Sequence, residues 1–299
     1  MAASSSASRT IVTGEAYSRA CQGCLRRGCG LCGRVSRVDD DLGLALRLAD
    51  AADAITLPRF RAADLHVRTK PDRSPVTDAD TACEEALRAL IATERPTDAV
   101  LGEEGGGSVT GAARGWVLDP IDGTKNFSRA MPAWGTLIAL AVDGEAVVGV
   151  ASAPALGRRW WAARGHGAST TDAPGATPRR IAVSGISELG DAYLSTTDLR
   201  VFGQQGRMDR WLALVDAVWE TRAFGDFWQH VLVAEGVLDV AVDPIANPWD
   251  LAALAPILAE AGGRLTDLSG ASTWSGGDAL TTNGTLHAAA LSVVGRQPR

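Results

Sequence analysis

The stretch 116-WVLDPIDGTKNF-127 brings two carboxylates, a proline, a glycine and a threonine to one corner of the chain. Three apolar residues lead into Asp119, and Asp122 follows directly before Gly123 and Thr124. Turns are rich in Asp, Pro and Gly, so an ordinary turn accounts for part of this pattern. An ordinary turn does not require the second acid or the threonine. Because both are present, the corner is a candidate metal site.

Two other acidic motifs also stand at the ends of expected elements. The motif 102-GEE-104 follows the apolar run 99–101, and 249-WD-250 opens a helical pattern. Strand ends meet at one edge of a sheet, and Mg²⁺ prefers oxygen ligands. We therefore predict that acids from distant segments share a metal site. Gly123 and Thr124, at an expected helix start, would offer backbone N–H groups to a phosphate.

Each acid also has a plainer interpretation. Thr77 with Asp80 spells a capping box for the helix that follows. Asp250 is a natural N-cap, and Glu103 with Glu104 suits a solvated loop. For any one of these residues alone the structural interpretation is at least as good. The joint pattern, with five acids all at element ends, favours the metal site.

Hydrophobic periodicity predicts the surrounding elements. We expect a first helix from near Asp39, where the acids 39–41 suit a helix N-terminus, and a second over 83–91. The expected strands are 99–101, 116–118, 137–142, 146–151, 160–163, 192–195 and 237–242, and further helices are expected at 208–219, 227–234 and 249–261. The first strands form an antiparallel meander, with a hairpin at 143-DG-144. This order predicts a layered α/β fold with mixed sheets.

The hexapeptide D-P-I-D-G-T, with G-E-E before it and W-D after it, resembles the inositol monophosphatase family of Mg²⁺-dependent phosphomonoesterases. The resemblance covers about residues 39–295. It implies an αβαβα sandwich with mixed and antiparallel sheets, and a site with two or three Mg²⁺ ions. It also implies a small-molecule phosphate ester as substrate and a homodimer.

The resemblance also implies a role for each matching residue. Asp80 and Thr124 would orient and deprotonate the attacking water. Gly123 and Thr124 would hold the phosphate, and Lys70 and Glu104 would be accessory residues. The metal ligands would be Glu103, Asp119, Asp122, Asp250 and the Ile121 backbone carbonyl.

Two further acids bear on the choice of phosphate ester. Asp226 and Asp243 match positions near the substrate's leaving group, where extra negative charge favours a cationic leaving group. Asp226 is equally suited to capping the next helix. The stretches 153–168 and 225–236 look like the histidinol-phosphate phosphatase branch of the family. The alternatives are an inositol-1-phosphate or broader sugar-phosphate phosphatase, and a non-catalytic regulator that binds phosphate esters.

Composition excludes other classes of protein. With 29 basic and 35 acidic residues, the net charge of -6 argues against nucleic-acid binding. No apolar run reaches the roughly 18 residues of a membrane helix, so no membrane partner is expected. Cys83 is the only cysteine after residue 32 and favours a reducing, cytoplasmic location.

The first 38 residues differ in composition from the rest. They contain six Arg and one acid, which cannot support a buried core. We predict a disordered extension, either a transit peptide that would imply a plastid or a misassigned start. The segment 21-CQGCLRRGCGLC-32 could alternatively bind zinc, although the middle spacing is short for such a site. The phosphatase domain would span 39–299, with lobes of about 39–180 and 181–299.

Overall fold

The computed structural model describes residues 30–71 and 73–296, with side chains from residue 38 onward. The predicted cysteine segment 21–32 lies outside the residues whose side chains are described. Residues up to Asp40 and residues from Asp41 onward form separate units. The architecture below is that of the second unit.

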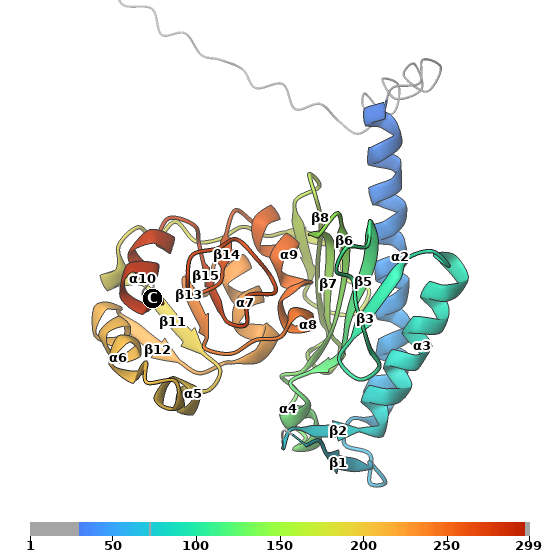
Figure 1. Ribbon diagram of the computed structural model, residues 1–299, viewed down its shortest axis with the longest axis horizontal. Coiled ribbons are helices and arrows are strands. Elements are labelled where there is room, and N and C mark those ends of the chain that lie inside the picture. The colour runs from blue at the N-terminus through green and yellow to red at the C-terminus, as the bar shows by residue number, and fades with distance from the viewer. Residues whose placement is uncertain (1–29, 72, 297–299) are drawn as a thin grey trace, which may run out of the picture. The chain divides into compact units, whose positions relative to one another are not determined.

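A large sheet of eight strands lies on one side of this unit (Figure 1). All neighbouring strands are antiparallel except β3 and β5, which run parallel. In spatial order the strands are β10 (Arg179–Arg180), β9 (Ala168–Thr171), β8 (Arg158–Ala163), β7 (Glu145–Ala153), β6 (Gly135–Val142), β5 (Arg114–Asp122), β3 (Ala99–Gly102) and β4 (Gly106–Gly107). The predicted meander is thus part of this sheet.

A smaller sheet of five strands is mixed, with parallel pairing of β11 to both β12 and β13. Its spatial order is β12 (Glu220–Arg222), β11 (Tyr193–Thr196), β13 (Val240–Asp243), β15 (Ala279–Thr282) and β14 (Arg264–Thr266). A separate hairpin of β1 (Val67–Thr69) and β2 (Pro75–Thr77) precedes the large sheet in the chain.

Helices cover both sheets and separate them (Figure 1). The outer layer on the large sheet holds α3 (Asp78–Glu94) and the part of α2 (Gly30–Arg59) that begins at Asp41. The middle layer holds α7 (Asp226–Ala234), α8 (Pro248–Leu251) and α9 (Leu254–Glu260). The small sheet is covered by α5 (Leu199–Gln204), α6 (Met208–Ala217) and α10 (His287–Val294). The predicted αβαβα sandwich is confirmed.

The core between the large sheet and the middle layer is apolar. Trp160 on β8 meets Phe227 on α7 edge to face, with ring centroids 6.1 Å apart. Leu254 and Ile257 on α9 pack in the same cluster and are fully buried. Each aliphatic side chain buried in this way contributes about 1.5–3 kcal/mol. This packing fixes α7 and α8–α9 against the sheet whose strand ends carry the acids.

Two expected helices differ from the observed ones. The first begins at Gly30, so the acids 39–41 lie inside α2, and Asp41 is buried in an ion pair with Arg114 at 2.9 Å. The helix expected over 249–261 is interrupted between α8 and α9. Pro256 has no N–H to donate to the Ala252 carbonyl, so a continuous helix would lack that hydrogen bond.

The interruption between α8 and α9 lies directly against strand β7. A Cβ atom at Gly149 would lie 2.0 Å from the Ala253 carbonyl oxygen. Only glycine permits this approach of backbone to backbone. Gly149 therefore helps to set how close α8, which carries Asp250, lies to the large sheet.

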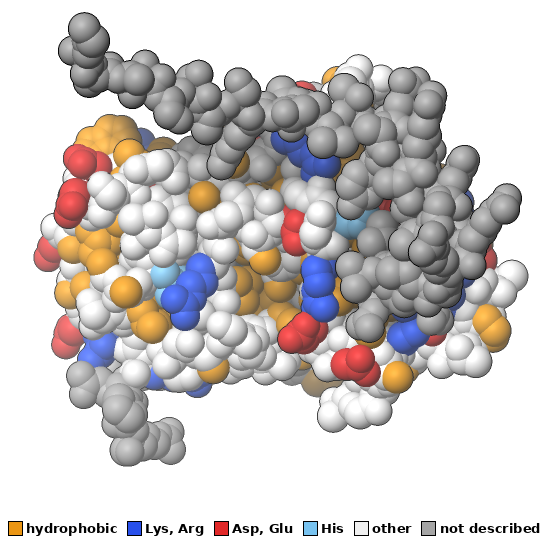
Figure 2. All heavy atoms as spheres, turned by 90° about the horizontal axis from the view of Figure 1, so that it is seen from above, with side chains coloured by type: hydrophobic (Ala, Val, Ile, Leu, Met, Phe, Trp, Pro, Cys, Tyr) orange, Lys and Arg blue, Asp and Glu red, His pale blue; other side chains and the backbone are white. Residues whose placement is uncertain are grey.

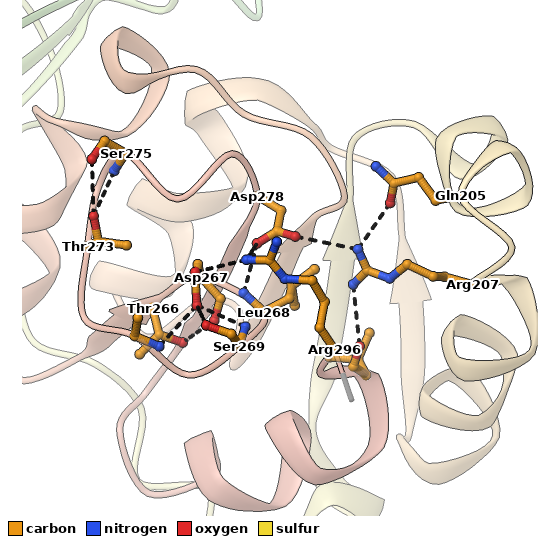
Figure 3. A network of polar contacts seen from close by, with 12 residues as sticks. Gln205, Arg207, Thr266, Asp267, Leu268, Ser269, Thr273, Ser275, Asp278 and Arg296 are labelled. Atoms are coloured by element: carbon orange, nitrogen blue, oxygen red, sulfur yellow. Dashed lines mark hydrogen bonds and ion pairs between the residues drawn. The ribbon is translucent and has the colours of Figure 1, made fainter. Parts of the chain in front are cut away.

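A polar network ties the chain between β14 and β15 to the C-terminal helix (Figure 3). Asp278 accepts a hydrogen bond from Leu268 N at 2.8 Å and pairs with Arg296 at 3.3 Å. Asp267 accepts from the backbone of Ser269 at 2.8 Å. These residues do not line the cavity described below, and their contacts hold the chain around the small sheet together.

On the face in Figure 2, basic and acidic side chains lie in small scattered groups, without a continuous basic area. None of the described helices combines the length and the apolar character that a bilayer crossing needs.

Candidate metal centre

Strand β5 ends in a bulge that places Asp119 and Asp122 together. Asp119 pairs with Leu137 on β6, and Asp122 pairs with Gly135, so three steps on β5 match two on β6. In a regular strand, residues three apart point to opposite faces. The extra residue removes this alternation. Both acids can therefore face one site, which the sequence spacing alone did not guarantee.

Asp250 completes a cluster of three carboxylates. It is the third residue of α8, and oxygens of Asp119, Asp122 and Asp250 all lie within 4.8 Å of one another. The cluster joins the end of a central strand to the start of a helix more than a hundred residues later. Three of the four predicted metal-ligand side chains thus come together.

Backbone N–H groups fix one oxygen of each carboxylate. Ile121 N donates to Asp119 Oδ1 at 3.0 Å, and Phe227 N donates to Asp122 Oδ2 at 2.5 Å. Asn247 N donates to Asp250 Oδ2 at 2.7 Å. The N-cap of α8 is therefore Asn247 and not Asp250 as expected, and Asp250 completes the capping box from the third helical position. The second oxygen of each carboxylate takes no part in these bonds. The three acids are therefore oriented before any ligand binds.

Burial makes this concentration of negative charge unfavourable without a cation. Burial raises the pKa of Asp119 well above its usual range, and the nearby Glu103 and Asp122 add to the effect. Burial likewise raises the pKa of Asp250 to about 7, with Glu103 and Asp243 contributing. A divalent cation held by carboxylate oxygens would offset this repulsion.

Glu103, the fourth predicted ligand, lines one cavity together with Asp119, Asp122 and Asp250 but is not part of their tight cluster. Its Oε1 accepts a hydrogen bond from Lys70 Nζ at 2.7 Å, and Glu104 Oε1 lies 2.6 Å from the same nitrogen. The two predicted accessory residues thus contact each other beside Glu103. Lys70 supplies one positive charge at the edge of the acidic site.

Asp80 and Thr124 lie next to each other beside the carboxylate cluster. Thr124 Oγ1 lies 3.3 Å from Asp80 Oδ1 and 2.9 Å from the Ile121 carbonyl oxygen. Burial raises the pKa of Asp80 to about 6, which the hydrogen bonds from Thr77 partly counteract. A carboxylate with a pKa in this range can accept a proton near neutral pH.

Thr124, Glu103 and the three clustered acids line a cavity of about 190 Å³, whereas Asp80, Lys70 and Glu104 lie outside its lining. Its carboxylate oxygens are the ligand type that Mg²⁺ prefers. Glu103 is paired with Lys70, whereas Asp119, Asp122 and Asp250 form no ion pair with a described residue. The residues present therefore fit a hard divalent cation. The lining consists of Ser74, Pro75, Glu103, Asp119, Ile121, Asp122, Gly123, Thr124, Lys125, Asp226, Asn247, Trp249 and Asp250.

Comparison with known proteins agrees with this geometry. The model of the inositol monophosphatase family matches residues 38–297. The chain belongs to the inositol monophosphatase family. It is a phosphoric monoester hydrolase.

Similar proteins within the family cover most of the chain. A histidinol-phosphatase of Mycobacterium tuberculosis is 54% identical over 248 residues, which are 83% of this chain and 95% of that protein. A histidinol-phosphatase of Streptomyces coelicolor is 51% identical, covering 83% of this chain and 94% of that protein. Among solved structures, an inositol monophosphatase from Zymomonas mobilis is 34% identical with a TM-score of 0.75, covering 86% of this chain and 98% of that one.

The two acids predicted near the substrate's leaving group, Asp226 and Asp243, differ in their access to the cavity. Asp226 lines the cavity, whereas Asp243 is not among the lining residues. Gln229 Nε2 donates to Asp243 Oδ1 at 2.7 Å, and His230 Nε2 lies 2.7 Å from Asp243 Oδ2. Thr197 also donates to Asp243. Both oxygens of Asp243 are therefore engaged inside the protein, behind the turn that carries Asp226.

Asp226 has a backbone conformation that few residues adopt. Its φ is 49°, in the left-handed region that Asp and Asn tolerate better than most residues. Asn126 Nδ2 donates to its Oδ2 at 3.1 Å, and Thr197 Oγ1 accepts from its N–H at 3.0 Å. The side chain is thus held at the cavity wall. Burial, with a contribution from Asp243, raises its pKa to about 6.

Sequence reasoning assigned no role to several residues at or beside this cavity. Lys125 follows Thr124 directly and is a cation beside the predicted phosphate position. Asn126 holds Asp226, and Asn247 both lines the cavity and holds Asp250. Lys125 and Asn126 stand within the stretch 116–127, and Asn247 stands two residues before 249-WD-250. Only the folded structure shows that Lys125 and Asn247 line the cavity and that Asn126 holds Asp226.

Proposed function

We propose that this protein hydrolyses L-histidinol phosphate to L-histidinol and phosphate, with Mg²⁺ as cofactor. The observation that carries the choice of substrate is Asp226, an acid at the cavity wall that is separate from the three-carboxylate cluster. Histidinol carries a primary amine and an imidazole, both of which can be cationic. The two histidinol-phosphatases that are 54% and 51% identical to this chain over 83% of its length support the same choice.

In this proposal Asp119, Asp122, Asp250 and Glu103 hold Mg²⁺, together with the Ile121 carbonyl. When bound, Mg²⁺ supplies positive charge that stabilises the phosphoryl oxygens and makes a water more acidic. The backbone N–H groups of Gly123 and Thr124, at the start of α4 (Thr124–Ser128), bind the phosphate. Lys125 adds a cation on the same side of the cavity.

The proton of the attacking water passes to the Asp80–Thr124 pair. Thr124 Oγ1 can donate to Asp80 Oδ1 while accepting from the water, so the water is oriented and its proton has an acceptor. Positioned proton transfer of this kind contributes about 10²–10⁴-fold to rate. Asp226 faces the leaving group and favours a cation there. Asp243, whose oxygens are engaged, then supports the turn of Asp226 instead of binding the substrate directly.

A phosphate-release assay with Mg²⁺ tests this proposal. The substrates are histidinol phosphate, inositol-1-phosphate, fructose-1,6-bisphosphate and an adenosine bisphosphate. We expect the highest kcat/KM with histidinol phosphate. A clear preference for inositol-1-phosphate or a sugar phosphate would refute the choice of substrate, and no release from any of them would refute catalysis.

Other parts of the proposal have separate tests. Two or three bound Mg²⁺ ions would be counted by equilibrium dialysis, and a homodimer would be detected by sedimentation. A variant that starts at residue 39 should keep full activity if residues 39–299 form the phosphatase domain. Fractionation of cells would test a cytoplasmic location.

A further inference from the structure

A buried carboxylate outside the cavity holds the turn that carries Glu103. Glu84 lies on α3 and is 2% exposed. It accepts hydrogen bonds from the backbone N–H groups of Glu104 and Gly105, each at 2.8 Å. Arg88, one helical turn further on, donates to Glu84 at 2.7 Å and to the Gly106 carbonyl at 2.6 Å. Three hydrogen bonds thus link α3 to the turn 102–106, and the Glu84–Arg88 pair within α3 supports them.

The sequence of the turn fits this carboxylate. A Cβ atom at Gly102 would lie 2.2–2.6 Å from three carboxyl atoms of Glu84, and one at Gly105 would lie 2.8 Å from Glu84 Oε1. Contacts this short are not tolerated by any larger residue without a shift. The two glycines that flank Glu103 and Glu104 are therefore explained by the position of Glu84.

Helix stability alone does not account for Glu84. An i,i+4 ion pair on a helix surface contributes about 0.3–0.5 kcal/mol, whereas burying a carboxylate such as that of Glu84 costs several kcal/mol. The bonds to the turn offset this cost. The turn 102–106 has no large apolar side chain to anchor it, since it consists of glycines and two acids. Its ends are held by the strand pairing of Gly102 with Gly106 and Leu118. Between them, the backbone is held by Glu84 and by the bond from Glu103 N to the Leu118 carbonyl at 3.2 Å.

We propose that Glu84, supported by Arg88, is a positioning residue that holds Glu103 ready to bind Mg²⁺. Asp80 lies one helical turn before Glu84, so α3 sets the positions of both the proton acceptor and a metal ligand. The inference rests on the proposed function, because it requires that Glu103 binds the metal. Without Glu84, ordering of the turn would have to accompany each binding event and would weaken it.

The test measures Mg²⁺ binding by titration calorimetry without substrate, and kcat at saturating Mg²⁺. Partners that orient metal ligands typically contribute 10–100-fold to affinity, so we expect Glu84→Gln to weaken Mg²⁺ binding about 10-fold or more. Its kcat at saturating Mg²⁺ should stay close to that of the wild type. Arg88→Met should weaken binding less, since both backbone bonds to Glu84 remain.

The matched control is Glu235→Gln. Glu235 is also buried and accepts hydrogen bonds from Trp160 at 2.6 Å and Arg179 at 2.6 Å, but it does not line the cavity. It should lose thermal stability with unchanged Mg²⁺ affinity. A folded Glu84→Gln protein with wild-type affinity would overturn the inference. If that variant does not fold, unchanged affinity in Arg88→Met would overturn it. A wild-type protein that binds no Mg²⁺ would instead refute the proposed metal site, and the inference with it.

Discussion

Asp80 uses its two oxygens for two different purposes, and Thr124 meets only one of them. Oδ2 accepts a hydrogen bond from Thr77 N at 2.8 Å and caps α3, while Oδ1 lies 3.3 Å from the Thr124 hydroxyl. The capping and the catalytic interpretations of this residue seemed to be alternatives in the sequence. The geometry is compatible with both, because a carboxylate can serve both at once.

Asp80→Asn should separate the two roles. The amide oxygen can still accept from Thr77, so the cap survives, but the residue can no longer take a proton. We expect kcat to fall about 10²–10⁴-fold with little change in Tm. Asp80→Ala should lose the same activity and also about 1 kcal/mol of stability. An Asn variant with near-normal kcat would show that Asp80 only caps the helix.

Asp119→Asn tests the metal centre. Turnover should be abolished, and the calorimetric Mg²⁺ signal should be lost or greatly reduced. In the absence of metal at pH 8 the variant should unfold at a higher temperature than the wild type, because a buried charge beside Glu103 and Asp122 is gone. Thermal unfolding with and without Mg²⁺ measures this. Normal turnover would contradict the assignment.

Asp226→Asn tests substrate selection. Asn tolerates the left-handed backbone at this position, whereas Ala would add strain. Loss of the negative charge should lower kcat/KM for histidinol phosphate by about 10-fold or more, the scale of a charge-assisted hydrogen bond. The value for inositol-1-phosphate should change much less. Equal losses on both substrates would make Asp226 a purely structural residue.

The order of elements around the site could be predicted because its signals are local. The apolar runs before Asp119 and Glu103 mark strand ends, and the apolar stripe after Asp250 marks a helix. Strand β15 was not predicted, because two of its four residues, 279-ALTT-282, are threonines and the apolar run is too short to indicate a strand. Thr281 and Thr282 are nevertheless fully buried, because their hydroxyls bond to His230 and His287.

The contacts that hold the site could not be predicted because they join distant segments. The hydrogen bond from Phe227 N to Asp122 joins residues 105 positions apart, and no local sequence pattern at either residue indicates it. Glu84 precedes Glu85 on α3, and such a pair suggests a solvated helix face. Only the approach of the glycine turn shows that Glu84 is buried while its neighbour is exposed.

His287 should make the second lobe sensitive to acid. Burial lowers the pKa of this histidine to about 4, from 6.5 for an exposed one. Thr266 donates its hydroxyl hydrogen to the Asp267 carbonyl, so it must accept from Nε2, and Nδ1 accepts from Thr282. Both ring nitrogens are thus satisfied in the neutral form (Thr266 is labelled in Figure 3).

The sign of the effect follows from proton linkage. Between pH 4 and 6.5 the unfolded chain binds the proton and the folded protein does not, so the free energy of unfolding falls as the pH falls through this range. The shift in pKa corresponds to about 3 kcal/mol in the free energy of unfolding. This stabilisation is fully present above pH 6.5 and is lost near pH 4. Denaturant unfolding of wild type and His287→Gln at several pH values measures it. Subtracting the two curves removes the contribution of the carboxylates, which both proteins share. The difference should shrink from pH 7 to pH 4, and parallel curves would show that the pKa of His287 is the same in the folded and the unfolded protein.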